Sequence, residues 1–571
     1  MHVIATAGHV DHGKSTLVRA LTGVDPDRWE EEKQRGMTID LGFGATTLDS
    51  GRELAFVDVP GHVRFIKNML AGVGAVDACL FVVAATEGWK PQSEEHLRIL
   101  ELLDLSHGVV ALTKVGLCDE DLVELARMDL AEHLQGSFLE QSEVVEVDVP
   151  SGIGVQALRE ALDRLAASTP RAVDSGRPRL WVDRAFAAKG SGTVVTGTLT
   201  GGALAVDDEL VLLPRDIAVR VRALQSHHQA RSTAMPGSRV AVNLVGVAHA
   251  DVERGDVLLR AAQWHRTRMA DASMTVLASL DHEVSRRGAY VAYLGSGEIP
   301  VKVRVLGERS LVPGEEGLIR LHLPRAFPMR PGDRFVLRES GRKETVGGGQ
   351  ILDVAPILPA SKARPDRSVD RVIRERGYVE AVELERLTGE RREPNLGPWV
   401  TDPDLLDALR SQVEMLIRTS GPLGLDVVSL DPRQRAVLPL IDGIRVEAGR
   451  VTAAEAIDPL ADHPYVAALD ASPFAPPSAE GIDRAELREL VRRGVVVSHD
   501  GVYFSAGALD AAARKVAALL QVKPEGVTVA EVRDALGCSR KHTLPLMSLL
   551  DGRGVTRRRG DVRIGGPRLP S

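Results

Sequence analysis

The chain has 571 residues, of which 44% are hydrophobic and 26% are charged; this is ordinary for a globular protein of several domains. The net charge of −8 excludes a uniformly basic surface but allows local basic patches. Three widely separated cysteines, Cys79, Cys118 and Cys538, have no metal or redox spacing, which favours a reducing compartment. No signal peptide or membrane-spanning run is evident, so we expect a cytoplasmic protein with no membrane association.

Residues 1–172 alternate short apolar runs with helical segments. Four runs, HVIATAGH, LAFVDVPGH, ACLFVVAA and GVVALTK, read as strands, and EEHLRILELLDL reads as a helix between two of them. Short apolar runs separated by helices are typical of buried parallel strands. We therefore predict an α/β domain over residues 1–172.

Short strands with glycine-rich turns follow a linker rich in proline and arginine. GTVVTGTLTGG, DDELVLL, VRVRAL and RVAVNLVG are β-branched or alternate with period two. Two small β-barrels fit this pattern, over residues 178–262 and 268–356, with a break near residue 265. From residue 366 to 571 the chain repeats a helix, a turn, a second helix and a hairpin, which predicts two to four winged-helix modules.

A phosphate-binding loop is predicted where the first strand ends. GHVDHGKS matches the pattern GxxxxGK[ST] between a strand and a helix. Its backbone N–H groups would surround a phosphate, Lys14 would add a charge, and the Ser15 hydroxyl would ligate Mg²⁺. The predicted nucleotide-binding residues here are Gly8, His9, Val10, Asp11, His12, Gly13, Lys14, Ser15 and Thr16.

Two further motifs extend this site. DVPGH ends the second strand; Asp58 is predicted to hold the metal, and Gly61 to donate its N–H to the γ-phosphate. RGMTIDLGF carries Thr38, a further metal ligand that appears when the γ-phosphate orders the loop. His62 is predicted to be catalytic, because it is placed to orient the attacking water. The alternative interpretation of His62 is a surface loop histidine.

GHVDHGKS, RGMTID and DVPGH together resemble the translational GTPases, and GTVVTGTLTGG resembles the second domain of elongation factor Tu. The N-terminal motif, Asp40 after Thr38-Ile39, VDRAFAAKGSGTVVTGT and the winged-helix tail resemble the selenocysteine-specific elongation factors, the SelB family. This resemblance implies a P-loop GTPase domain, two barrels and winged-helix modules, with GTP and Mg²⁺ as cofactors. It implies a monomer that delivers selenocysteinyl-tRNA to the ribosome at recoded UGA codons, anchored to a hairpin of the messenger RNA.

A pocket for the selenocysteinyl group is predicted on the first barrel. A selenol is more acidic than a thiol, so it is anionic at neutral pH, whereas the serine hydroxyl of the precursor tRNA is neutral. Arginines beside the amino acid would therefore discriminate by charge. Arg184 and Arg239 are the predicted residues, placed where this family is thought to use arginines, and Asp40 or His62 is predicted to complete the pocket. Ordinary salt bridges on the barrel are the alternative.

The last module carries a predicted RNA-binding face. GCSRKHTLPLMSLLDG reads as a recognition helix that begins with Arg540 and Lys541, and TRRRGDVRI reads as the wing. The basic groups predicted on the wing are Arg557, Arg558, Arg559 and Arg563. Basic groups at a helix start and on a wing converge on one face suited to a phosphate backbone. A solvated run of arginines is the alternative, and the choice of RNA over DNA depends on the GTPase in front.

The base-reading loop departs from the family pattern. VVALTKVGLCDED keeps Lys114, which is predicted to pack against the base, and has Thr113 where asparagine is usual. Gly116 stands where the family has the aspartate that accepts two hydrogen bonds from guanine. Asp148, in a loop before the last helix of the domain, is predicted to compensate, and Asp119 is the other candidate.

Two further functions are open, of which the first would share the front 350 or so residues. One is a GTPase subunit that regulates a metabolic enzyme, which has no use for a basic winged-helix tail. The other is a DNA-binding regulator switched by nucleotide, which the two barrels argue against because they suit a tRNA carrier.

Overall fold

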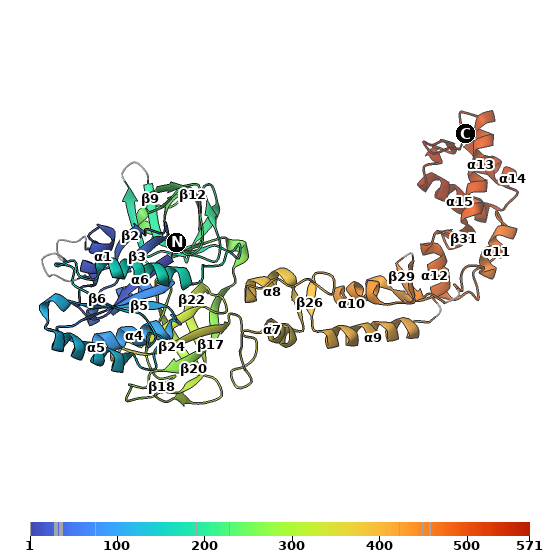
Figure 1. Ribbon diagram of the computed structural model, residues 1–571. Coiled ribbons are helices and arrows are strands. Elements are labelled where there is room, and N and C mark those ends of the chain that lie inside the picture. Colours follow the sequence, from blue (N-terminus) through green and yellow to red (C-terminus); the bar gives the residue numbers. More distant parts are fainter. Residues whose placement is uncertain are drawn as a thin grey trace. The chain divides into compact units, whose positions relative to one another are not determined.

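The computed structural model describes residues 2–27, 32, 38–74, 76–188, 192–227, 229–421, 423–447, 449–455 and 458–570 (Figure 1). The chain forms two compact units, one of Met1–Pro394 with Pro398–Asp402 and one of Asn395–Gly397 with Pro403–Ser571. We find no helix among the described residues that is long and apolar enough to cross a membrane.

The first unit begins with a six-stranded sheet. Across the sheet the strands are β2 (Gly42–Thr47), β3 (Glu53–Asp58), β1 (His2–Ala7), β4 (Ala78–Ala84), β5 (Gly108–Thr113) and β6 (Val144–Val147). The four predicted strands are confirmed as parallel neighbours, and β6 extends them in parallel. Strand β2 was not predicted and pairs antiparallel with β3 at the edge.

Helices cover both faces of this sheet (Figure 1). They are α1 (Lys14–Thr22), α3 (Ile66–Val73), α4 (Pro91–Leu102), α5 (Glu120–Leu134) and α6 (Val155–Ser168). Because strand side chains alternate, Val3 packs in one core cluster with Leu97 of α4, while Ile4 packs in another with Leu17 of α1 and Leu158 of α6. Because β1, β3 and β5 run parallel, the loops that follow them meet at the carboxyl edge of the sheet, where open α/β folds bind ligands.

The first barrel comprises strands β7 to β16. Their bounds are β7 (Arg179–Trp181), β8 (Arg184–Ala188), β9 (Gly192–Thr200), β10 (Leu204–Ala205), β11 (Glu209–Leu213), β12 (Ile217–Ser226), β13 (Gln229–Arg231), β14 (Thr233–Ala234), β15 (Ser238–Val245) and β16 (Val257–Leu259). The main sheet runs β11-β16-β7-β9-β15-β12, and β11 also pairs with β12, which closes it. The four strands predicted here correspond to β9, β11, β12 and β15.

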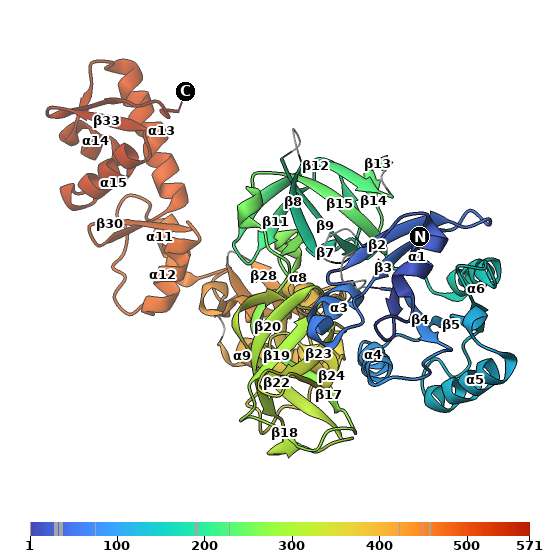
Figure 2. The same ribbon diagram turned by 90° about the vertical axis from the view of Figure 1, so that its left-hand side faces the viewer.

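The second barrel closes in the order β17-β22-β20-β19-β23-β24. Its strands are β17 (Arg266–Val276), β18 (Val284–Ser285), β19 (Tyr290–Leu294), β20 (Gly297–Val305), β21 (Ser310–Leu311), β22 (Glu316–Pro328), β23 (Arg334–Glu339) and β24 (Glu344–Asp353). Figure 2 shows α3 of the α/β domain beside β19, and the two elements are in contact. Tyr293 of this barrel packs in the same core cluster as Leu97 of the α/β domain.

A small helix pair packs directly onto the second barrel. Its elements are α7 (Val369–Arg376), β25 (Tyr378–Glu380), α8 (Ala381–Thr388) and β26 (Trp399–Thr401). Val372 and Leu384 belong to the same core cluster as Phe327 and Phe335 of the barrel. The sequence groups all residues from 366 onward into one tail. In the structure this tail is divided, because its first module, α7 to β26, shares the hydrophobic core of the second barrel.

The second unit holds the remaining helices and hairpins. In chain order they are α9 (Pro403–Thr419), β27 (Leu425–Asp426), α10 (Pro432–Val437), β28 (Ile444–Glu447), β29 (Arg450–Ala453), α11 (Pro464–Ala471), α12 (Arg484–Arg492), β30 (Val496–His499), β31 (Val502–Ser505), α13 (Ala506–Val522), β32 (Val527–Thr528), α14 (Val529–Leu536), α15 (Arg540–Gly552), β33 (Thr556–Arg559) and β34 (Val562–Gly565). Helices α13, α14 and α15 enclose one core with Leu509, Val532 and Leu546. The hairpin β33–β34 follows α15 directly, which is the predicted order of recognition helix and wing.

Candidate functional site

The predicted phosphate loop connects β1 to α1 and spans residues 8–16, the last three being the first residues of α1. Gly8 has a φ of 127°, and a Cβ there would lie 2.1 Å from the Val82 carbonyl oxygen, so only glycine fits against β4. Helix α4 holds the loop from outside. Gly8 N–H donates to Nδ1 of His96 over 3.1 Å, and Val10 N–H donates to Gln92 over 3.3 Å.

Lys14 is the first residue of α1, and its ammonium is buried in the loop. Nζ donates to the carbonyl oxygens of Gly8 and His9. Burial lowers the pKa of Lys14 to about 8, and the charges of Asp58 and other nearby carboxylates act in the opposite direction. Because the hydrogen bonds of this cation run to neutral carbonyls, an anionic phosphate would be a stronger partner.

The three residues predicted to hold a metal converge beside the loop. Ser15 Oγ lies 2.7 Å from Thr38 Oγ1 and donates to Asp58 Oδ2 over 2.6 Å. Burial raises the pKa of Asp58 to about 6, against hydrogen bonds from Ser15 and Thr6. Asp27, which was not predicted, accepts from Thr38 Oγ1 over 2.9 Å. Hydroxyl and carboxylate oxygens are the ligands Mg²⁺ prefers, so this donor set fits that ion.

The loop after β3 approaches the phosphate loop through its backbone. A Cβ on Gly61 would lie 2.5 Å from Nζ of Lys14 and 2.6 Å from the Val10 nitrogen, so this position also needs glycine. His62 follows and is partly buried; its Nδ1 accepts from the Arg64 N–H over 3.1 Å, and its ring lies 5.9 Å from that of Phe65. Of the predicted segment 35–43, residues 35–37 lie outside the described residues.

The residues predicted to read the base lie at the ends of β5 and β6. Thr113 Oγ1 donates to the His12 carbonyl over 2.7 Å, which ties β5 to the phosphate loop. Lys114 Nζ lies 3.3 Å from Oε1 of Glu87. A Cβ on Gly116 would be 2.7 Å from Oδ2 of Asp148, so the Asp148 carboxylate lies directly beside this glycine.

The two candidates for the missing carboxylate differ in their surroundings. Asp148 is buried and accepts from the backbone and hydroxyl of Ser151, over 3.2 and 2.6 Å. Asp119 caps α5 and accepts from the Leu122 N–H over 2.9 Å, which is the role of a helix N-cap. The geometry favours Asp148 as the carboxylate nearest to Gly116.

The two predicted arginines of the first barrel lie against one aromatic ring. The guanidinium carbon of Arg239 lies 3.4 Å from the centre of the Phe43 ring in β2, and that of Arg184 lies 5.0 Å from it. Both arginines also line a cavity of about 230 Å³ between β2 and the barrel. Sequence reasoning placed these arginines together but did not identify Phe43, because a lone aromatic residue in a glycine-rich segment carries no such signal.

Each arginine already has a polar partner. Arg239 forms a bidentate ion pair with Asp183 and donates to Thr196 over 3.1 Å. Burial acts to raise the pKa of Asp183, but the ion pair with Arg239, the hydrogen bond from Thr196 and the charge of Arg184 hold this pKa below its usual value. Arg184 donates to the Leu41 carbonyl over 2.8 Å, and its Nη2 lies 4.0 Å from Asp40. The salt bridges weighed as an alternative therefore exist, and they orient both guanidinium groups toward Phe43.

Asp40 lies between Thr38, which is predicted to hold the metal, and the first barrel. Its nearest cation is Arg254, whose Nη2 donates to Oδ1 over 2.5 Å. Arg254 also donates to Asn68 of α3 over 2.9 Å and to the Asp183 carbonyl over 3.0 Å. Arg254 therefore contacts Asp40, which follows Thr38, and Asn68, which follows Gly61. It joins both to Asp183, the residue that pairs with Arg239. It was missed because an arginine in a loop between strands resembles ordinary surface charge.

The basic residues predicted to form one face of the last module differ in their exposure. Arg540 and Lys541 are exposed at the start of α15, and Arg557, Arg558 and Arg559 are exposed on β33. Arg563 does not belong to this face. It is only 7% exposed, and its Nε lies 3.2 Å from Asp551, so it is a buried structural ion pair.

Family models match three parts of the chain. The "Elongation factor Tu GTP binding domain" matches residues 1–168, "Elongation factor Tu domain 2" matches residues 192–259, and "Elongation factor SelB, winged helix" matches residues 518–564. These correspond to the α/β domain, most of the first barrel and the last module. The three matches follow one another in the order predicted from the motifs.

Individual relatives agree with this order. The selenocysteine-specific elongation factor of Desulfomicrobium baculatum is 41% identical over 351 residues, covering 62% of this chain and 55% of that protein. Elongation factor Tu 2 of Streptomyces avermitilis is 32% identical over 386 residues, covering 62% of this chain and 96% of that protein. A crystal structure of a bacterial selenocysteine-specific elongation factor superposes with a TM-score of 0.72 at 25% identity and covers 99% of both chains. The chain matches just over half the length of the Desulfomicrobium relative.

Proposed function

The chain belongs to the elongation factor Tu family of translational GTPases and, within it, to the selenocysteine-specific elongation factors, and from this premise we propose that it delivers selenocysteinyl-tRNA to the ribosome in a GTP-dependent manner. The observation that carries the proposal is the pair Arg184 and Arg239 on Phe43, beside the segment that bears Thr38. An anion-binding pocket in contact with a nucleotide-sensing segment is what such a carrier requires.

GTP would occupy the loop of residues 8–16, with Lys14 against its phosphates. Ser15, Thr38 and Asp58 would hold Mg²⁺, which neutralises phosphate charge when bound. Gly61 presents its backbone to Lys14, so its N–H is placed to reach a terminal phosphate. His62, the next residue, is assigned to orient the attacking water, and hydrolysis of GTP is the proposed reaction.

Guanine would be read by Asp148, because a carboxylate is the group that accepts from both N1–H and the 2-amino group. The Gly116 position leaves the space that this carboxylate occupies. Lys114 would lie along the base, and Thr113 would fix the end of β5 to the phosphate loop.

The pocket would select the selenolate by charge. Arg184, Arg239 and Arg254 carry three positive charges against the two carboxylates of Asp40 and Asp183, which leaves one net positive charge (3 − 2 = +1). An anionic selenolate in the adjoining cavity would gain a charge-assisted contact worth ~1.5–3 kcal/mol. A neutral serine hydroxyl would not gain this energy. Because both arginines are already paired with protein groups, one such contact is the expected contribution.

The last module would bind a messenger RNA hairpin. Arg540 and Lys541 at the start of α15 and the three arginines of β33 are exposed basic residues that would contact its phosphates. In the preceding module, Arg450, Arg492 and Arg493 surround the buried carboxylate of Glu489, so these three arginines have an internal role. We assign the RNA contact to the last module. A monomer in the cytoplasm that acts on the ribosome completes the proposal.

Retention of aminoacyl-tRNA tests the function directly. The purified chain with GTP is expected to protect selenocysteinyl-tRNA from hydrolysis of its ester bond, and not seryl-tRNA with the same tRNA body. Equal protection of both tRNAs would remove the selenocysteine assignment. Failure to protect any aminoacyl-tRNA, with GTP hydrolysis intact, would favour a GTPase that regulates another protein.

A further inference from the structure

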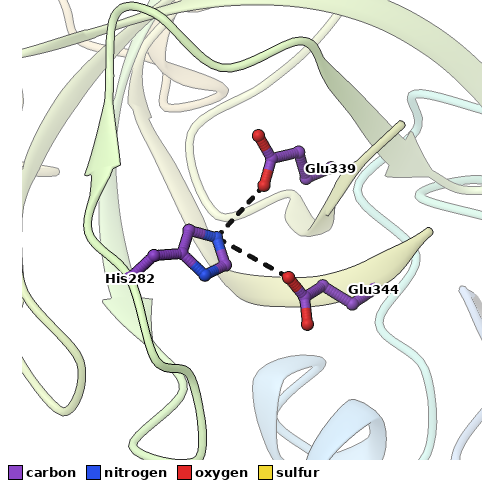
Figure 3. A group of neighbouring side chains, drawn as sticks. All are labelled: His282, Glu339 and Glu344. Atoms are coloured by element: carbon purple, nitrogen blue, oxygen red, sulfur yellow. Dashed lines mark ion pairs between the residues drawn. The ribbon is translucent and has the colours of Figure 1, made fainter. Parts of the chain in front are cut away.

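The second barrel carries a group of polar side chains that the proposed function does not use. His282 lies in the loop between β17 and β18, Glu339 ends β23 and Glu344 begins β24 (Figure 3). Nε2 of His282 lies 3.1 Å from Oε2 of Glu339 and 3.7 Å from Oε1 of Glu344. The three side chains are 15%, 17% and 37% exposed, in that order. One nitrogen and two oxygens from three segments thus face a common point.

The charges of this group are not balanced by its hydrogen bonds. Glu339 and Glu344 are register partners across the β23–β24 hairpin, and like charges placed opposite each other destabilise a hairpin. Nε2 of His282 and Oε1 of Glu344 are both buried atoms without a hydrogen-bond partner among the described residues. Arg342 lies 3.4 Å from Glu339 and 4.0 Å from Glu344, but its side chain is 52% exposed and water screens its charge.

The hydrogen bond from His282 to Asp281 indicates which ring nitrogen carries the proton. Its Nδ1 lies 3.0 Å from Oδ1 of Asp281, and because an ionised carboxylate only accepts, Nδ1 carries the proton. Nε2 is then the ring nitrogen that faces the carboxylates of Glu339 and Glu344. A histidine whose other ring nitrogen donates to a carboxylate is the usual arrangement of a metal ligand. The cluster contains both the candidate ligands and the group that would orient the imidazole.

We propose that His282, Glu339 and Glu344 bind a divalent transition-metal ion, Zn²⁺ being the best fit. Zn²⁺ takes nitrogen and oxygen ligands at about 2.0–2.2 Å in a tetrahedron, which places ligand atoms roughly 3.3–3.6 Å apart. The distances of 3.1 and 3.7 Å from Nε2 bracket that value. A nitrogen ligand disfavours Mg²⁺ and Ca²⁺, which prefer oxygen. A water molecule completes the coordination, and Arg342 turns toward solvent.

The bound ion would join the loop of residues 277–283 to the β23–β24 hairpin. Its role is to stabilise this end of the barrel, because it replaces the repulsion of Glu339 and Glu344 with two ligand bonds. The site involves neither the phosphate loop nor the arginine pocket, so it does not depend on the proposed function.

Metal binding to the full chain tests the proposal. The protein is first stripped with a chelator and saturated with Mg²⁺ and GDP, so that the nucleotide site is filled. Calorimetric titration with Zn²⁺ is expected to show one site and an upward shift of the melting temperature. His282→Ala is expected to abolish that site, and Asp281→Asn to weaken it by ~10–100-fold. His322→Ala is the control, since His322 is exposed on the same barrel outside the cluster.

Three results would overturn the proposal. They are no Zn²⁺ binding at micromolar concentration, an unchanged isotherm in His282→Ala, or an equal loss in His322→Ala. If His282→Ala does not fold, Glu339→Gln decides, because glutamine keeps the size of the side chain and removes the charge. Wild-type Zn²⁺ affinity in a folded Glu339→Gln protein would show that Glu339 is not a ligand and would also overturn the proposal.

Discussion

The carboxylate of Asp148 lies where a side chain on Gly116 would project, since a Cβ on that glycine would come within 2.7 Å of Oδ2. The two positions are 32 residues apart, yet only one of them can carry a large side chain. The glycine at position 116 thus makes room for the carboxylate of the aspartate at position 148.

Asp148→Asn is expected to lower GTP affinity by ~2–4 kcal/mol, because two donors of guanine lose their ionised acceptor. The variant should gain affinity for xanthosine triphosphate, whose base presents an oxygen in place of the 2-amino group. Nucleotide affinities measured by competition check both effects. Asp119→Asn is the matched control, because asparagine still caps α5. A shift toward XTP in Asp119→Asn and none in Asp148→Asn would reverse the assignment.

Gly116→Ala tests the same relationship from the other side. The added methyl group would displace the Asp148 carboxylate, so GTP affinity is expected to fall by at least tenfold. The double variant Gly116→Ala with Asp148→Asn should then lose less than the two single effects combined, because both act on one contact. Additive losses measured in this cycle would show that the two residues act independently.

The arginine pocket predicts a loss of discrimination. Arg184→Ala or Arg239→Ala should each lower affinity for selenocysteinyl-tRNA by roughly 10-fold or more, with little change for seryl-tRNA, because only the selenolate gains from the charge. Arg266→Ala is the control, since that barrel arginine pairs with Asp216. Ester-protection assays with both tRNAs provide the measurement. Parallel loss for both tRNAs would instead indicate that the arginines support the barrel.

Arg254 is expected to couple the nucleotide to this pocket. It contacts Asp40, Asn68 and the Asp183 carbonyl, so Arg254→Ala should reduce the preference for tRNA in the GTP state over the GDP state. A change of ~1–3 kcal/mol is typical of such coupling. The measurement is tRNA affinity in each nucleotide state, with GTP affinity itself as the internal control. A variant that binds tRNA as the wild type does in both states would exclude this role.

The sequence predicts those parts of the molecule whose local pattern repeats a known physical requirement. Glycines and a lysine between a strand and a helix define the phosphate loop, and apolar runs define β1, β3, β4 and β5. GFGATT was not recognised as strand β2, because its glycines carry little strand propensity and its pairing depends on the edge of β3. Arg563 resembled its basic neighbours, because only the tertiary fold brings it to Asp551.

The site residues missed by the sequence act through contacts distant along the chain. His96 reaches Gly8 from α4, and Arg254 reaches Asp40 from the barrel, over separations of 88 and 214 residues. A spacing pattern in one sequence does not contain such pairs. The boundary of the tail was missed for a related reason, since α7 and α8 complete the core of the second barrel.

Acid sensitivity of the phosphate loop follows from His96. Burial lowers the pKa of His96 to about 3 from its ordinary 6.5, so below pH 6.5 the unfolded chain binds a proton that the folded chain does not. This destabilises the fold increasingly as pH falls, by up to about 2 kcal/mol at pH 5. Burial acts oppositely on Asp58 and Asp77, whose pKa values it raises to about 6. The effect of His96 must therefore be isolated by comparison with a variant.

His96→Asn keeps an acceptor for the Gly8 N–H but does not titrate. Its free energy of unfolding, relative to the wild type, is expected to rise by about 2 kcal/mol between pH 7.5 and pH 5. Denaturant unfolding of the nucleotide-free chain at both pH values provides the measurement, and His107→Asn on the surface loop sets the baseline. A pH-independent difference would mean that His96 is protonated in the folded state.

The basic face of the last module predicts a salt-dependent loss of RNA binding. Arg540→Ala or Arg558→Ala should weaken hairpin binding and reduce the salt slope by roughly 0.7–0.9 per phosphate contact removed, because fewer counterions are released. Arg553→Ala is the matched control, since Arg553 follows the opposite end of α15, about 20 Å from Arg540, and pairs with Asp510. Affinity measured over a range of salt concentrations separates a lost phosphate contact from misfolding, which would alter binding without this change of slope. GTP affinity should stay unchanged in all three variants. If GTP affinity fell as much as hairpin affinity, the tail would instead support the fold of the GTPase domain.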